Sequence, residues 1–172
     1  NLSKYKKSLR MALEEDKANN LYPTKLLSLV KSNLRDKEVL LLYLQGDKQI
    51  YRFKLSMNES NVALINESRL SAWQEVKTSL SQVSTSNQLP RTLLELSTDL
   101  LPEGIEKYKY ISFIPSSNLL GFPFMALTLR NLKSLDPIKI SSEKNFLIQR
   151  SSVRTVPSII DFFYKEKRKQ IP

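Results

Sequence analysis

The sequence predicts an α/β or α+β fold in which helices flank a mixed β-sheet. Two short apolar runs, Val39–Leu44 and Tyr110–Ile114, have the length and composition of buried strands. Between and before them lie segments, such as Leu26–Leu34 and Leu93–Leu100, in which leucines recur at helical spacing. Strands joined by tight turns, together with strands separated by helices, are typical of a mixed sheet covered by helices.

The first part of the chain is predicted to be helical. Apolar residues recur at helical spacing over residues 1–18, with lysines on the other side. Asn19 and Asn20 end this pattern, and Thr24 can cap a second helix that runs to about Leu34. We expect residues 1–36 to form amino-terminal helices, with the end of a helical repeat region as one interpretation.

Three strands are expected next. The aliphatic run Val39–Leu44 stops at a Gln-Gly-Asp turn around Gly46, and Ile50–Leu55 resumes it, which indicates an antiparallel hairpin. The first of these strands is apolar on both faces, so we expect it inside the sheet. A third short strand is predicted at Val62–Ile65.

The remaining elements follow from periodicity and turn residues. A helix over Ser68–Val83 places Trp73 in the core, and Leu89-Pro90 opens another helix that reaches about Leu100. After the second apolar run, the pattern predicts strands at Phe146–Gln149 and Val153–Val156 and a helix that begins at Ser158.

Composition excludes several kinds of chemistry. The chain has 172 residues, enough for one domain of ordinary size, and 41% of them are hydrophobic. It contains neither Cys nor His, which removes disulfides, thiolate nucleophiles and imidazole bases. With three glycines and scattered acidic residues such as Glu103, it predicts no phosphate loop, no cofactor and no metal site. No apolar run approaches the roughly 18 residues of a membrane span.

The net charge of +10 raises the question of a nucleic-acid partner. Much of the excess lies at the two ends, however, where lysines are more often solvated or face a neighbouring domain. Tyr108 and Tyr110, interleaved with Lys107 and Lys109, could stack bases. Alternation along a half-buried strand would produce the same pattern, so nucleic acid is disfavoured as a partner.

The segment from Tyr108 to Leu127 is the most informative part of the chain. Pro115 ends the strand because it has no N–H to donate, and Ser116, Ser117 and Asn118 favour a sharp turn or a helix cap. A Ser-Ser turn after a strand has some likeness to a nucleophile elbow. The flanking glycines and the histidine base are missing, so a turn or capping role is the preferred interpretation.

This segment resembles the CHAT family, the caspase-like domains found beside tetratricopeptide repeats. In that family a strand leads into Pro-Asp/Ser-x-x-Leu-x-x-Leu-Pro-Phe-x-Ala-Leu, with Phe here in place of the second Leu. The matching residues are Pro115, Ser116, Leu119, Phe122, Pro123, Phe124, Ala126 and Leu127. Glu38–Phe53 is similar to the opening hairpin of the family, and Asn145–Ile160, which contains Pro157 and Ser158, is similar to its later strand and helix start.

The resemblance implies a partial caspase-like sandwich, with residues 37–172 as the amino-terminal half of a CHAT-like domain. The catalytic His and Cys of the family follow the Pro-Ser helix, in sequence beyond this chain, so the matched residues are structural and none is catalytic. The implied partners are the missing carboxy-terminal half of the domain and helical repeats upstream. Strands from the missing half would extend the sheet, leaving a bare edge in its absence.

Two functions therefore stay open. The chain is either the non-catalytic scaffold portion of a caspase-like cysteine peptidase, or a basic regulatory module that binds an acidic protein or nucleic acid without a catalytic parent. The absence of cysteine suits a cytoplasmic location, and the start at Asn1 suggests an internal fragment.

Overall fold

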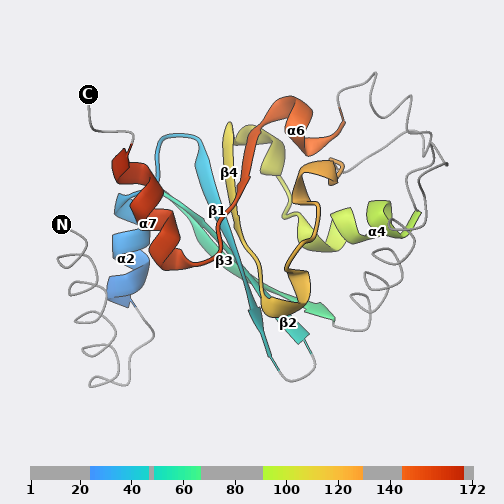
Figure 1. Ribbon diagram of the computed structural model, residues 1–172, viewed down its shortest axis with the longest axis horizontal. Helices are drawn as coiled ribbons and strands as arrows, with labels where there is room; N and C mark the ends of the chain where they lie inside the picture. The colour runs from blue at the N-terminus through green and yellow to red at the C-terminus, as the bar shows by residue number, and fades with distance from the viewer. Residues whose placement is uncertain (1–23, 47–48, 67–90, 130–144, 169–172) are drawn as a thin grey trace.

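The computed structural model describes residues 24–46, 49–66, 91–129 and 145–168 (Figure 1). The helices predicted over residues 1–18 and 68–83, with Trp73, lie outside the described residues. The described helices are α2 (Thr24–Ser32), α4 (Arg91–Leu100), α6 (Leu147–Arg150) and α7 (Ile159–Arg168). The described strands are β1 (Glu38–Gln45), β2 (Gln49–Ser56), β3 (Ser60–Asn66), β4 (Tyr110–Ile114) and β5 (Ser152–Thr155).

The strands form one five-stranded mixed sheet in the order β3-β2-β1-β4-β5. Strands β1, β4 and β5 are parallel to one another, whereas β2 is antiparallel to both β1 and β3. The sheet and its flanking helices confirm the predicted α/β class. β1 occupies the centre, as its apolar faces predicted, and the two apolar runs are direct neighbours because Val39 pairs with Ile111.

Helices cover both faces of the sheet (Figure 1). Because side chains alternate along a strand, Val39, Leu41 and Tyr43 point to one face and Leu40 to the other. The first face packs against α4, α6 and the segment after β4, and the second packs against α2 and α7. All four side chains are at most 1% exposed, which explains why this strand reads as an unbroken apolar run.

One hydrogen bond closes the β1–β2 hairpin, and another joins β1 to helix α4. The Gly46 amide donates to the Gln49 carbonyl at 2.8 Å. A Cβ at Gly46 would lie 2.9 Å from the Tyr51 ring, so a larger residue there would have to displace that ring. On β1, the buried Tyr43 hydroxyl donates to the Leu100 carbonyl at 2.7 Å, at the last residue of α4. Burial raises the pKa of Tyr43 far above its usual range, so this hydroxyl stays a donor.

Most predicted elements are present within a residue or two. α2 ends at Ser32 and not at Leu34, and β5 begins one residue before the prediction. The strand predicted at Phe146–Gln149 is wrong, because residues 147–150 form the single helical turn α6. Local bonds replace a ladder there: the Ser151 amide donates to the Leu147 carbonyl at 3.0 Å, and only Phe146 pairs in strand fashion, with Thr128.

Candidate functional site

The residues of the sequence motif gather at the carboxyl ends of β4 and β5. These strands are parallel neighbours in which Phe113 pairs with Thr155, and the Val156 amide donates to the Phe113 carbonyl at 2.7 Å. Pro115 and Pro157 each follow two residues after that pair. The two halves of the motif, far apart in sequence, therefore leave the sheet side by side at one edge.

The turn after β4 is built as the sequence suggested. Pro115 is buried, and a 3₁₀ turn, η2 (Ser117–Leu119), begins directly after Ser116. The Leu119 amide donates to the Ser116 carbonyl at 3.0 Å, and the Leu119 side chain is fully buried. Gly121 then adopts a left-handed φ of 79°, which reverses the chain toward the core.

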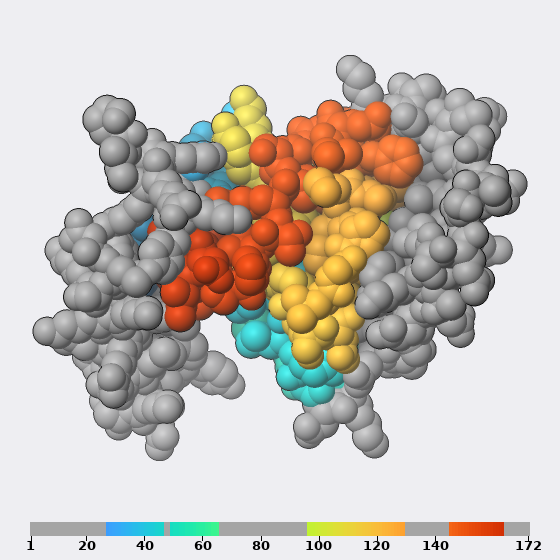
Figure 2. Space-filling model, viewed as in Figure 1, coloured from blue at the N-terminus to red at the C-terminus, as the bar shows by residue number. Residues whose placement is uncertain are grey.

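The aromatic part of the motif fills the space between this turn and the sheet. Phe124, at the start of the 3₁₀ turn η3 (Phe124–Ala126), stacks on Phe113 of β4 with ring centroids 4.3 Å apart. Phe122 lies 5.0 Å from Phe124, and both rings are at most 5% exposed. Leu127 is fully buried, while Pro123 and Ala126 are half-buried. The segment is a core plug, and in the space-filling view it adjoins the α6–β5 segment (Figure 2).

The serines at this edge differ in their surroundings. Ser116 is 7% exposed, and its hydroxyl makes no hydrogen bond in the structure, so the capping bond considered for it is absent although the turn is present. Ser117 is exposed. The Asn118 amide bridges to β1, where it donates to Gln45 Oε1 at 3.0 Å.

The second half of the motif starts α7. Pro157 is exposed, and the Ser158 hydroxyl accepts a 3.2 Å bond from the Asp161 amide while it donates to the Asp161 carboxylate at 2.7 Å. Ser158 is thus an N-cap of the ordinary kind. With no thiol and no imidazole in the chain, this carboxyl edge carries no nucleophile–base pair of the caspase type.

A buried polar network, which the sequence pattern did not predict, crosses the sheet beneath α7. Glu38 of β1 is 2% exposed, and its carboxylate accepts bonds from Ser112 of β4 at 3.2 Å and from Arg154 of β5 at 3.0 Å. Arg154 Nε also donates to the Ser112 hydroxyl at 2.7 Å. The sequence offered only a polar residue in or beside each apolar segment, and these three residues are seen to belong together once the strands are known to be adjacent.

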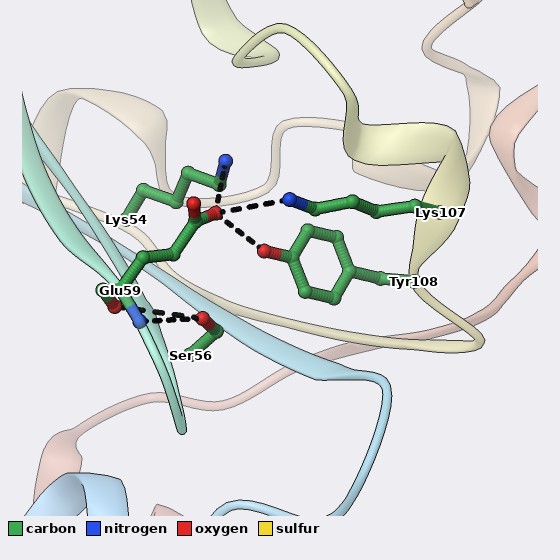
Figure 3. Close-up of polar contacts among 5 residues, drawn as sticks. All are labelled: Lys54, Ser56, Glu59, Lys107 and Tyr108. Carbon is green, nitrogen blue, oxygen red and sulfur yellow. Dashed lines mark hydrogen bonds and ion pairs between the residues drawn. The ribbon is translucent and has the colours of Figure 1, made fainter.

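A second cluster, the Glu59 cluster, lies near Glu38, at the end of the sheet opposite the carboxyl ends of β4 and β5. Figure 3 shows its side chains. Glu59 Oε1, in the β2–β3 turn, accepts the Tyr108 hydroxyl at 2.6 Å and contacts the ammonium groups of Lys54 at 2.5 Å and Lys107 at 3.4 Å. Hydrogen bonds from Lys54 and then from Tyr108 lower the pKa of Glu59 to about 2. The Tyr108 ring has both lysines near its faces, with Lys54 Nζ 5.5 Å and Lys107 Nζ 5.1 Å from its centroid.

This arrangement corrects one interpretation of the two tyrosines. Tyr108 is 6% exposed and precedes β4, where it joins the core, whereas Tyr110 is 39% exposed on β4 with Arg35 5.5 Å from its ring centroid. The two rings therefore do not share a surface on which bases could stack. A pocket of about 320 Å³ borders the Glu59 cluster and also has Arg35, Lys37 and Glu38 in its wall.

In the described parts of the chain, no three acidic side chains come close enough together to hold a metal ion. None of the helices described is both long and apolar enough to cross a membrane.

Neither a family model, nor a curated protein, nor a solved structure matches the chain.

Proposed function

We propose that this chain is the non-catalytic, amino-terminal scaffold portion of a CHAT-type, caspase-like protein. The observation that carries the proposal is the position of the Pro115–Leu127 segment, which plugs the core directly after β4 at the carboxyl end of neighbouring parallel strands. In open α/β sheets, functional sites form outside the carboxyl ends of parallel strands. The turn at Ser116 is thus where such a scaffold would meet active-site loops.

The catalytic pair of such a protein comes from outside this chain. A caspase-type mechanism needs a thiolate and an imidazole, and the chain contains neither Cys nor His. Strands carrying that pair would extend the parallel half of the sheet along β5, the outer strand on that side. The partners in this proposal are the carboxy-terminal half of the same domain and helical repeats that precede α2.

The experiment compares this chain with the polypeptide that continues through the downstream reading frame. Each is incubated with peptide reporters and with a thiol-directed peptidyl probe. We expect no hydrolysis and no labelling for the chain alone, and labelling at a single Cys for the longer polypeptide, abolished by replacement of that Cys or of its His. Turnover by the repurified chain alone, or a downstream sequence without a His and Cys pair, would overturn the proposal.

A further inference from the structure

The outer edge of β3 lacks the features that usually protect a sheet edge. Its sequence, SNVALIN over Ser60–Asn66, contains no charged residue and no proline, in a chain of which 26% is charged. Lysine, proline or a bulge normally prevents an edge strand from pairing with another chain. Within the described residues β3 is the last strand of the sheet, so its outer backbone groups have no ladder partner.

The hairpin geometry shows which backbone groups face outward. The Ser56 amide donates to the Glu59 carbonyl at 2.9 Å, which makes this the hydrogen-bonded pair that closes the turn. Hydrogen-bonded and non-hydrogen-bonded pairs alternate along an antiparallel ladder. Counting from the turn along the observed register, Ser60, Val62 and Leu64 occupy non-hydrogen-bonded positions against β2. Their N–H and C=O groups therefore point away from the sheet.

One face beside this edge is apolar. Val62 is 53% exposed and Leu64 is 61% exposed, and both point to the same face because they are two residues apart. Val62 pairs with Phe53 of β2, and Leu64 pairs with Tyr51 of β2; both β2 side chains are half-buried. Tyr51 also pairs with Leu44 of β1, whose side chain is 46% exposed. An apolar strip thus runs across three strands up to the edge.

The other face beside the edge is a polar pocket with basic walls. Asn61 and Ala63 point into a pocket of about 350 Å³ that is also lined by Arg52, Lys54, Pro102 and Glu103. Arg52 Nη1 donates to the backbone carbonyl of Asp99 at 2.6 Å. The positive charge of Arg52 lowers the pKa of Tyr43, although burial raises that pKa by more. Two basic side chains and one carboxylate therefore line this pocket, and one of the two basic side chains, Lys54, also contacts the Glu59 carboxylate.

We propose that the edge of β3 binds an extended segment of a partner protein in which apolar and acidic residues alternate. The segment adds a sixth strand: its main chain bonds to Ser60, Val62 and Leu64, and its apolar side chains extend the strip formed by Val62 and Leu64. Its acidic side chains lie on the other face, beside the pocket that Arg52 lines. Main-chain bonds supply affinity, and the two unlike faces supply the choice of sequence.

A second copy of the chain fits this edge less well. Two copies each carry a net charge of +10, and β3 of a second copy would offer only Asn61 and Ala63 to the basic pocket, with no carboxylate. An acidic segment has the complementary charge. This inference does not depend on the proposed scaffold role, since the edge lies on the other side of the sheet from β5.

The test uses a labelled peptide of about eight residues, the length of a typical strand, in which glutamate and valine alternate. Its control has the same composition with all glutamates in one half. We expect the alternating peptide to bind the chain about tenfold more tightly, as measured by fluorescence anisotropy. Val62→Pro removes an N–H that points outward from β3 and leaves the β2–β3 ladder bonds intact, so we expect it to weaken peptide binding about tenfold. Val62→Thr retains this N–H, and we expect its affinity for the peptide to stay within about threefold of the wild-type value.

N-methylated peptides keep the test valid if Val62→Pro does not fold. Methyl groups on the alternate amides that face β3 should abolish binding, while methyl groups on the other amides should leave it intact. Equal binding of the two isomeric peptides would overturn the proposal in favour of plain charge attraction. Dimerisation in sedimentation experiments that Val62→Pro abolishes would also overturn it, with a second copy as the occupant.

Discussion

Arg154 lies 3.0 Å from Glu38, so an ion pair joins β5 to β1 across the intervening strand β4. The Ser112 hydroxyl of β4 sits between them and bonds to both. On its outer side, the Arg154 guanidinium stacks over the Phe162 ring of α7, with its carbon 5.1 Å from the ring centroid. One arginine thereby ties three strands and a covering helix together.

Breaking this ion pair from one side should be costly. Arg154→Met leaves the Glu38 carboxylate buried without its cation, so we expect the free energy of unfolding in urea to fall by about 3 kcal/mol. Glu38→Leu combined with Arg154→Met removes both charges and should cost clearly less than the sum of the two single changes. Strict additivity would show that the two charges do not interact.

Phe124 is expected to be the most sensitive residue of the motif. It is 1% exposed and stacks on Phe113, so Phe124→Ala should cost about 3–5 kcal/mol and unfold a marginal domain. Its neighbour Met125 is 50% exposed, and Met125→Ala should change stability by less than about 0.5 kcal/mol. Equal melting temperatures for the two variants would place Phe124 outside the core.

The lowered pKa of Glu59 predicts how the free energy of unfolding changes at acidic pH. A carboxyl whose folded pKa is lowered contributes stability that is complete above its unfolded value and is lost as the pH falls through the folded value. For Glu59 the window lies between its ordinary pKa of 4.5 and about 2. Glu59→Gln should therefore flatten the dependence of unfolding free energy on pH in this window, because the unfolded wild type binds the extra proton there.

Carbon-detected NMR can follow the Glu59 carboxyl directly. Its titration midpoint should lie near 2, and Lys54→Met should move it upward more than Tyr108→Phe does, because Lys54 makes the larger contribution. High salt should raise the midpoint as well, since the Glu59 side chain is 41% exposed and its ion pairs are screened. A midpoint near 4.5 in the wild type would show that the cluster does not form in solution.

Ser158 caps α7, so its loss should weaken that helix alone. Ser158→Ala leaves the Asp161 amide without an acceptor and should cost about 1 kcal/mol in urea unfolding. Ser117→Ala is the matched control, because Ser117 is exposed and its hydroxyl caps no helix. A similar loss in both variants would mean that the cap contributes nothing specific.

Local sequence patterns predicted the five strands of the sheet, but they also predicted a strand at Phe146–Gln149 that is absent, and they did not predict the polar clusters. Val39–Leu44 is long, apolar and bounded by turn residues, so its type, burial and central place all follow from periodicity and flanking turns. Phe146–Gln149 is also largely apolar, but it is too short for its hydrophobic periodicity to distinguish a strand from a helix. Local hydrogen bonds hold it as a helical turn. Glu38, Ser112 and Arg154 meet only because three distant strands adopt one register, which no local pattern specifies.

The central place of β1 divides the folding of the sheet into two kinds of event. On one side β1 pairs with β2 and then β3 through short hairpins, which close on a microsecond scale. On the other side Val39 meets Ile111, and closing a loop of about 70 residues is entropically slower. Amides of β1 take part in both events, so their exchange with deuterium requires the loss of the whole sheet, while those of β3 can exchange by local fraying.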